Sequence, residues 1–314
     1  MKTYLVTGGC GFIGVNLIPR LIEQGVRVRV LDNLSLGRRE DVDPLGVDLH
    51  VGDIRDSAVV AKACKGIDAV VHLAAHTRVV ESLSDPQLNF DINAAGTLNV
   101  LQACRNAGIP KMIFASTGGA ILGEQDPPVH EGMVPRPISP YGASKLAGEA
   151  YCSAYAGAYG LKTAALRFSN VYGPYSYHKG SVVAQFFRNL LQGEPILVYG
   201  DGEQTRDFLY VADLVEAILL ADKTEPAGEV FQIASGRETS VRSLLEAMKA
   251  MLPERTFDVR FEPARAGEIL RNYANVEKAR RILGFDPKTQ LNEGLRTTWQ
   301  WFISHDRDGI KIVA

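Results

Sequence analysis

The first fourteen residues constrain the fold of this chain more than any other stretch. An apolar run at 1–7 is followed by glycines at positions 8, 11 and 14. Glycine lets a strand turn sharply into a helix and lets the backbone approach a phosphate, while the first helical turn offers unpaired N–H groups. The pattern predicts a strand, a phosphate-binding loop and a helix. The residues expected to line the phosphate site are Gly8, Gly11, Phe12, Ile13 and Gly14.

A carboxylate follows the second predicted strand. The run at 27–31 ends in Asp32, about 20 residues beyond the glycine loop, where an acidic side chain can accept both hydroxyls of an adenosine ribose. An acid at this place would repel a 2′-phosphate. The pattern therefore predicts a dinucleotide site that takes NAD rather than NADP.

The composition argues against several classes of partner. The formal net charge of −2 gives no general attraction to nucleic acid or to an anionic membrane. The four cysteines are far apart, the six histidines show no metal-ligand spacing, and the chain runs into its first strand without a leader-like segment. We expect a cytoplasmic protein with free thiols and with no metal, nucleic-acid or membrane partner.

Short apolar runs alternate with helical patterns through much of the chain, which predicts an α/β fold with a doubly wound parallel Rossmann sheet. Further strands are expected at 49–51, 69–73, 111–116, 162–168 and 229–233, and long helices at 86–107 and 141–159. Beyond about residue 170, glycines and prolines mark a less regular region. There we expect a smaller, discontinuous α/β substrate-binding domain. The division expected is 1–170 plus 208–235 for NAD, and 171–207 plus 236–314 for substrate.

Tyr141 and Lys145 lie four residues apart at the start of a predicted helix, so they share one face of it. A lysine ammonium favours a phenolate, and lowering a tyrosine pKa from about 10 to near 7 requires about 4 kcal/mol. The strand at 111–116 delivers Ser116 and Thr117 to the carboxyl edge of the sheet, where ligands of such folds bind. A phenol, an ammonium and one of these two hydroxyls are expected to converge there.

A second Tyr-x-x-x-Lys pattern is formed by Tyr175 and Lys179. It follows a Gly-Pro pair in an expected loop and has no suitable strand before it. We therefore expect this second pair to be non-catalytic.

Together, several motifs strongly resemble the extended short-chain dehydrogenase/reductase superfamily, in particular its NAD-dependent nucleotide-sugar epimerases. The motifs are Thr7–Gly14, Leu31–Asn33, Gly52–Ile54, His72–Ala75, Ser116–Thr117 with Tyr141–Lys145, Leu166–Pro174 and Gly200–Phe208. The resemblance implies NAD contacts beyond the glycine loop, from Asp32, Asn33, Asp53, Ile54, Leu73, Ala74, Ala75, Tyr141 and Lys145. It also implies a homodimer formed through the two long helices.

The same resemblance implies a UDP-sugar site. Asn170 would meet the diphosphate, Ser181 and Val182 the nucleotide, Tyr199 the base, and Arg206 and Arg265 the phosphates. Asn272 would border the substituent at C2 of the sugar, where its modest size leaves room for an N-acetyl group.

The reaction expected within this superfamily is narrowed by the residues after the active-site hydroxyl. Dehydratases place an Asp-Glu pair there and decarboxylases a nearby glutamate, whereas this chain has Gly118, Gly119 and Ala120. Tyr175 stands where epimerases of 6-carboxy sugars often have an arginine. We expect NAD-dependent 4-epimerisation of a UDP-hexose through a transient 4-keto sugar, with Tyr141 removing the C4 hydroxyl proton. The alternatives are UDP-glucuronate 4-epimerisation, another nucleotide-sugar oxidoreduction and a non-catalytic NAD sensor.

Overall fold

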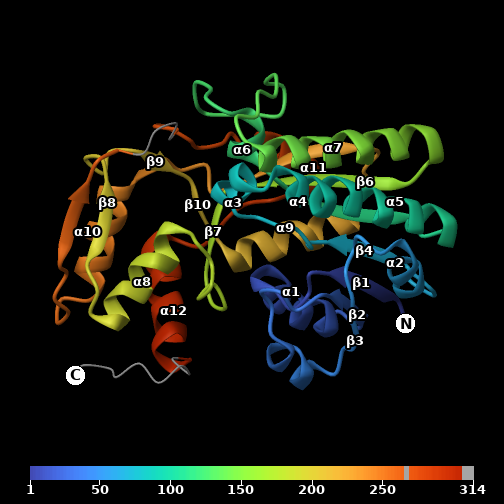
Figure 1. The fold of residues 1–314 in the computed structure, drawn as a ribbon, viewed down its shortest axis with the longest axis horizontal. Helices are drawn as coiled ribbons and strands as arrows, with labels where there is room; N and C mark the ends of the chain where they lie inside the picture. Colours follow the sequence, from blue (N-terminus) through green and yellow to red (C-terminus); the bar gives the residue numbers. More distant parts are fainter. Residues whose placement is uncertain (265–268, 306–314) are drawn as a thin grey trace.

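The computed structural model describes residues 1–264 and 269–305. Its centre is a parallel seven-stranded sheet in the order β11-β6-β5-β4-β1-β2-β3 (Figure 1). The strands are β1 Thr3–Thr7, β2 Arg27–Asp32, β3 Asp48–Val51, β4 Ala69–His72, β5 Lys111–Thr117, β6 Lys162–Phe168 and β11 Glu229–Ile233. The chain winds outward from β1 to β3 and then returns to β4 on the other side of β1. The doubly wound parallel sheet is confirmed, and its strand order reverses between β1 and β4, where ligands of open α/β sheets bind.

Helices pack their apolar sides on both faces of this sheet, so its central strands are buried on both sides. One face packs against α1 Phe12–Glu23, α9 Val211–Lys223 and α11 Glu277–Leu283. The other packs against α2 Ser57–Ala63, α5 Gly96–Ala107 and α7 Pro140–Tyr159. Shorter helical segments connect them, namely η1 Arg39–Asp41, η2 Asp43–Leu45, α3 Val79–Ser84, α4 Pro86–Phe90, η3 Asp91–Ala95 and α6 Gly118–Leu122.

A second apolar core, rich in aromatic side chains, is formed by residues between 172 and 302. Figure 1 shows three of its helices grouped away from the large sheet. They are α8 Val182–Gln192, α10 Val241–Met251 and α12 Leu291–Ser304. Three small two-stranded sheets accompany them, formed by β7 Asn170–Tyr172 with β10 Phe208–Tyr210, β8 Ile196–Tyr199 with β13 Val259–Glu262, and β9 Thr205–Arg206 with β12 Thr239–Ser240.

The helix expected at 86–107 is interrupted, since a π turn at Asp91–Ala95 separates α4 from α5. Within that turn the buried Asn93 side chain donates to the His76 carbonyl at 2.9 Å and to Ser144 Oγ at 3.2 Å. The wider turn thus satisfies a buried amide between two other segments. Across residues 1–264 and 269–305, no helix has the length and apolar character needed to cross a membrane.

Candidate active site

The loop after β1 can be built only with glycine at two positions. Gly8 has a φ of +69°, and a Cβ there would lie 2.7 Å from the Ala74 nitrogen. A Cβ on Gly14 would lie 2.4 Å from the Gly9 carbonyl oxygen. The loop closes when the Gly11 N–H donates to the Gly8 carbonyl at 3.1 Å, and α1 begins directly afterwards. Because no side chain caps α1, the first N–H groups of this helix are available to an anion.

Asp32 lies beside this loop at the end of β2. Its carboxylate accepts the Cys10 N–H at 3.0 Å and the Leu34 N–H at 2.8 Å. Burial raises the pKa of Asp32, and the two backbone hydrogen bonds oppose that rise. The carboxylate is therefore fixed at the rim of the glycine loop.

The other expected NAD contacts lie around the same edge of the sheet. Asn33 Nδ2 donates to Asp53 Oδ2 at 3.0 Å, and hydrogen bonds from Arg55 hold the pKa of Asp53 at about 2. Ile54 is buried beside Gly96, where a Cβ would come within 2.7 Å of it. Leu73, Ala74 and Ala75 follow β4 and are partly buried next to the Gly8 turn.

The two neighbouring hydroxyls at the end of β5 have different partners. Ser116 Oγ donates to Glu149 Oε1 at 2.6 Å, and Glu149 forms a buried two-point ion pair with Arg167, with both contacts at 2.8 Å. The Thr117 side chain instead forms a hydrogen bond with the phenol of Tyr141. Successive strand residues point to opposite faces, which separates the two hydroxyls.

Lys145 lies one turn beyond Tyr141 on α7, as its spacing predicts. Its side chain is 3% exposed, and Nζ donates to the Ala115 carbonyl at 2.8 Å. Burial lowers the pKa of Lys145 to about 8. Burial also raises the pKa of Tyr141 to about 12, despite the opposing hydrogen bond from Thr117. The expected lowering of the Tyr141 pKa is thus not a property of the protein alone, since desolvation of the phenolate dominates.

The residues expected at the nucleotide sugar come from the second core and its connections to the sheet. Asn170 begins β7, and its N–H donates to the Asp207 carbonyl at 2.9 Å. Ser181 precedes α8, which starts at Val182, and Ser181 Oγ is buried with no hydrogen-bond partner in the described part of the chain. Tyr199 ends β8. Arg206 Nη1 donates to the Ile269 carbonyl at 2.8 Å, whereas Arg265 lies outside the described residues.

Asn272 is brought against the segment that follows Thr117. A Cβ on Gly119 would lie 2.4 Å from Asn272 Nδ2, and one on Gly118 would lie 2.7 Å from Gln232 Oε1. In the sequence, Gly118 and Gly119 are informative because they stand where related dehydratases and decarboxylases have acidic residues. The structure adds that a Cβ at either position would displace a side-chain amide, that of Gln232 or of Asn272, and that Glu149 and Arg167 support the end of β5. One signal for Glu149 was present in the sequence, since it follows Lys145 by four residues.

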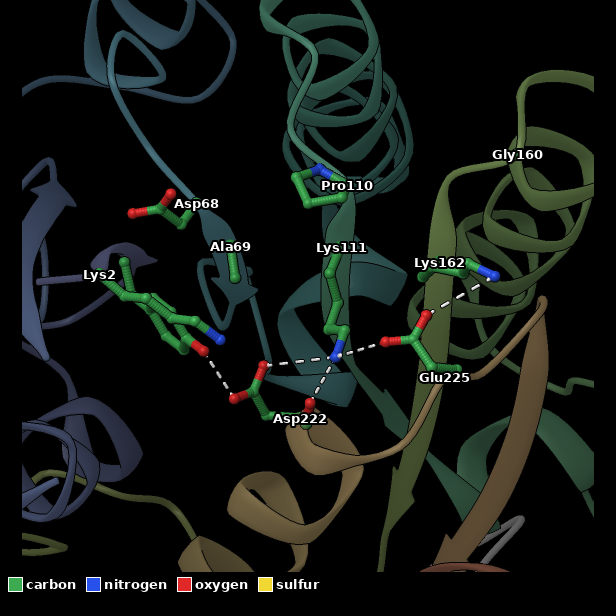
Figure 2. Close-up of a pocket in the computed structure, with 10 residues that line it drawn as sticks. Lys2, Asp68, Ala69, Pro110, Lys111, Gly160, Lys162, Asp222 and Glu225 are labelled. Carbon is green, nitrogen blue, oxygen red and sulfur yellow. Dashed lines mark hydrogen bonds and ion pairs between the residues drawn. The ribbon is translucent and has the colours of Figure 1, made fainter.

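A cavity of about 300 Å³ lies at the opposite edge of the sheet, where β1, β4, β5 and β6 begin. Figure 2 shows that its charged side chains face one another. Asp222 accepts the Tyr4 hydroxyl at 2.7 Å, and Glu225 lies 3.7 Å from Lys111 and 3.6 Å from Lys162. These charges offset one another, and the cavity is separate from the glycine loop. Over the described ranges, no three His, Cys, Asp or Glu side chains are placed to hold a metal ion.

Comparison with known proteins places this geometry in a family. Residues 4–234 match the NAD dependent epimerase/dehydratase family. A putative UDP-glucose 4-epimerase of Methanocaldococcus jannaschii is 38% identical over 307 residues, covering 96% of this chain and 99% of that protein.

Two solved structures have the same fold over nearly their whole length. A UDP-glucose 4-epimerase from Thermotoga maritima, solved with UDP-glucose, gives a TM-score of 0.92 at 38% identity and covers 96% of this chain and 99% of its own. A UDP-N-acetylglucosamine 4-epimerase from Methanobrevibacter ruminantium, in complex with UDP-N-acetylmuramic acid, gives 0.90 at 35% identity, with coverage of 96% and 98%. With the glycine loop, Asp32 and the Thr117, Tyr141 and Lys145 group in place, this chain belongs to the NAD-dependent epimerase/dehydratase family.

Proposed function

We propose that this chain is an NAD-dependent 4-epimerase of a UDP-hexose. The observation that carries the proposal is the group of Thr117, Tyr141 and Lys145 at the carboxyl end of β5, without a carboxylate in the three residues that follow Thr117. A dehydratase or a decarboxylase needs an acid or base that this segment lacks. Relatives that are named UDP-glucose 4-epimerases support the same reaction.

The cofactor proposed is NAD, and the residues present fit it. The loop at Gly8 and Gly14 leaves no room for a Cβ, as close approach to a pyrophosphate requires, and the Asp32 carboxylate suits an unphosphorylated adenosine ribose. When bound, NAD supplies a hydride acceptor and donor beside the sugar. Asn33, Asp53, Ile54, Leu73, Ala74 and Ala75 would line the rest of its site.

Tyr141 is the proposed acid and base at the C4 hydroxyl. As a phenolate it would take the proton of the C4 hydroxyl and become a neutral phenol, and Thr117 would form a hydrogen bond to the C4 oxygen and hold it in place. The ionised phenol is costly where Tyr141 lies, because burial raises its pKa to about 12. Positive charge beside it is therefore needed, and we propose that Lys145 supplies part of that charge while it binds the nicotinamide ribose.

We propose that the UDP part is held firmly and the sugar loosely, as turnover of a 4-keto sugar requires. The second core would bind the nucleotide through Asn170, Ser181, Val182, Tyr199, Arg206 and Arg265. The unpartnered Ser181 Oγ before α8 supports an acceptor or donor from the ligand at that place. We propose the domain division 1–170 plus 208–235 and 171–207 plus 236–314. The separate aromatic-rich core supports it in part, although α11 of the second part packs on the large sheet.

Asn272 is the proposed determinant of the sugar substituent at C2. Its amide packs on Gly119 beside the active-site strand, and the relative from Methanobrevibacter ruminantium is named for an N-acetyl sugar. We expect Asn272→Tyr to reduce kcat/KM for UDP-N-acetylglucosamine while largely keeping that for UDP-galactose, because the larger ring fills space near C2. Initial rates with both sugars test this, and an unchanged ratio would contradict it.

We also propose a homodimer in the cytoplasm. Tyr151 and Tyr159 of α7 are 41% and 51% exposed, and the Arg105 guanidinium of α5 lies 4.0 Å from the centre of the Tyr159 ring. Such large, exposed aromatic side chains suit a surface that a second copy covers. The four cysteines are all buried and unpaired, which suits a reducing compartment.

A proton NMR time course tests the proposed reaction. Purified protein is mixed, without added cofactor, with UDP-galactose, UDP-N-acetylglucosamine or UDP-glucuronate. We expect a 4-epimer to appear from at least one hexose, and Tyr141→Phe to abolish turnover while NAD stays bound. A reaction that starts only with added NAD(H) and stops stoichiometrically would point to a reductase, and turnover of UDP-glucuronate alone to the uronate alternative.

A further inference from the structure

Lys179 is a partly buried cation that has no carboxylate partner among the described residues. Within the described residues its Nζ has one hydrogen-bond partner, the Val171 carbonyl, and forms no ion pair with a carboxylate. The centre of the Phe12 ring lies 5.3 Å from the same nitrogen. Burial alone lowers the pKa of Lys179 to about 8. Charges withdrawn from water are usually paired in proteins, so a partly buried ammonium without a carboxylate is suited to an anion that a ligand brings.

The loop that carries Lys179 is fixed on two sides. Asn16 Nδ2, in α1, donates to the Pro174 carbonyl at 3.0 Å, which ties the loop to the first helix. Arg188 Nη1, in α8, donates to the Lys179 carbonyl at 2.9 Å and also to the Tyr177 carbonyl. With the backbone held in this way, the hydrogen bond from Nζ to the Val171 carbonyl keeps the ammonium near Phe12.

The neighbours of the ammonium indicate which anion it meets. Phe12 is the first residue of α1, directly after Gly11 of the glycine loop, where the pyrophosphate of a dinucleotide is proposed to bind. Val171 is adjacent to Asn170, which is proposed to meet the diphosphate of the nucleotide sugar. The Lys179 ammonium therefore contacts one residue next to each of the two proposed diphosphate positions.

We propose that Lys179 binds a diphosphate group in the cleft between the glycine loop and the loop at 173–181. This inference rests on the proposed function, since the diphosphate belongs either to the nucleotide sugar or to the dinucleotide. It gives a role to the second Tyr-x-x-x-Lys pattern, which lies in a loop between β7 and α8 as predicted. Lys179 acts in binding and not as the partner of a catalytic phenol.

The test compares Lys179→Met with wild-type protein and with Lys162→Met as the matched control. Lys162 lies in the cavity at the opposite edge of the sheet, so its loss removes a cation and its 3.6 Å contact with Glu225, away from both proposed ligand sites. Dissociation constants for UDP and for uridine are measured by calorimetry, and the NAD content of the purified protein is measured after its release. If the nucleotide sugar is the source, Lys179→Met binds UDP roughly ten- to hundredfold more weakly and uridine equally well. If the dinucleotide is the source, NAD is lost and UDP binding is kept.

Thermal unfolding without added nucleotide separates binding from a structural role. Removal of a partly buried charge that has no carboxylate partner should leave the midpoint of Lys179→Met unchanged or higher. Unchanged binding of UDP and NAD would overturn the proposal, whatever the midpoint does. If Lys179→Met does not fold, UDP affinity of the wild type is measured at pH 7 and at pH 8.5, below the ionisation of the uracil ring, beside Lys179→Arg. The affinity should fall more in the wild type than in Lys179→Arg, and equal falls in both would overturn the proposal.

Different results would contradict the proposed function and the proposed role of Lys179. Wild-type protein that binds neither UDP nor NAD and forms no 4-epimer would contradict the proposed function itself. Wild-type protein that epimerises, with Lys179→Met indistinguishable from it in both ligand affinities, would contradict only the role of Lys179.

Discussion

At the scale of single residues, the positions of Ser116 and Thr117 in the sequence do not decide which of the two is the active-site hydroxyl. Both are hydroxyls at the end of one predicted strand, and either could be chosen for the active site. The backbone alternation of β5 assigns them, because Ser116 Oγ is used by the buried Glu149 while Thr117 contacts Tyr141. One side chain thus supports the strand, and the other faces the proposed chemistry.

Substitution of each hydroxyl should have a different consequence. We expect Thr117→Val to lower kcat by about 10²-fold or more, because a hydrogen bond to the reacting oxygen is lost, with NAD still bound. Ser116→Ala should keep most of kcat but lower the free energy of unfolding by about 1–3 kcal/mol, since Glu149 loses a buried donor. Steady-state kinetics and denaturant unfolding measure both. The reverse pattern would assign the active site to Ser116.

His72 is a buried residue that links stability to pH. Its Nδ1 lies 2.6 Å from Thr7 Oγ1, and its Nε2 lies 3.0 Å from Thr97 Oγ1. Thr97 Oγ1 donates to the Asn93 carbonyl at 2.6 Å, so it accepts from Nε2–H and leaves Nδ1 as an acceptor for Thr7. The His72 ring is therefore neutral, with both of its nitrogens hydrogen-bonded.

The pH dependence follows from the pKa of His72, which burial lowers to about 3 from the usual 6.5. Between these values the unfolded chain takes up a proton that the folded chain does not, so stability is full above pH 6.5 and falls as the pH drops. At pH 5 the loss from this residue is about 2 kcal/mol. Denaturant unfolding of wild type and His72→Gln at pH 7.5 and pH 5 measures it. The wild type should lose more stability than the variant, and equal losses would rule out His72 as the cause.

At the scale of elements, α7 carries the proposed chemistry on one face. Tyr141, Lys145 and Glu149 follow one another at intervals of four residues, so they lie in a row along the helix. The last of them is pinned to β5 by Ser116 and to β6 by Arg167. The Glu149–Arg167 ion pair therefore fixes the position of α7, and with it the positions of the Tyr141 phenol and the Lys145 ammonium.

Breaking the Glu149–Arg167 ion pair should lower the stability of the protein more than its activity. We expect Glu149→Gln to lower the free energy of unfolding by about 3–5 kcal/mol, because the buried Arg167 would keep its charge without a partner. The double variant Glu149→Gln with Arg167→Met should recover part of that loss. Denaturant unfolding of the three variants tests the pair, and additive losses in the double variant would show that the two side chains are not coupled.

The elements were largely predictable because their periodicity and glycine ends are local signals. The strand at 229–233 has the predicted bounds, and α7 starts one residue before its predicted start at 141 and ends at 159 as predicted. The π turn at Asp91–Ala95 was not predictable, because one wider turn leaves the apolar repeat almost unchanged. Its cause lies outside the helix, in the carbonyl of His76 and the hydroxyl of Ser144 that the Asn93 side chain meets.

At the scale of the whole molecule, the site depends on contacts between distant parts of the chain. Asn272 reaches Gly119 although more than 150 residues separate them in the sequence. No local pattern encodes such a contact, and the sequence offered Asn272 only through family resemblance. The Val129 N–H donates to the Tyr273 carbonyl and the Asn275 N–H to the Val129 carbonyl, each at 2.9 Å, which joins the segment after α6 to the segment around Asn272.

Asp207 is the polar centre of this connection. Its buried carboxylate accepts the Ser235 N–H and hydroxyl, each at 2.7 Å, and the Gly236 N–H at 2.9 Å. It also accepts the Ala274 N–H at 3.5 Å. Asp207 directly follows Arg206. Its carboxylate thus joins the end of β11 and the segment after Asn272 to the chain at Arg206.

Asp207→Asn should therefore impair the proposed sugar site while the NAD site stays intact. The amide keeps one acceptor oxygen but turns a donor toward backbone N–H groups, which should cost about 1.5–3 kcal/mol in the free energy of unfolding. Because Arg206 and Asn272 lose their common support, we expect KM for the UDP-sugar to rise more than kcat falls. The glycine loop belongs to the other core, so NAD content should be unchanged. Unfolding, steady-state kinetics and NAD release measure the three effects. Loss of NAD at unchanged KM would show that Asp207 supports the large sheet rather than the sugar side of the cleft.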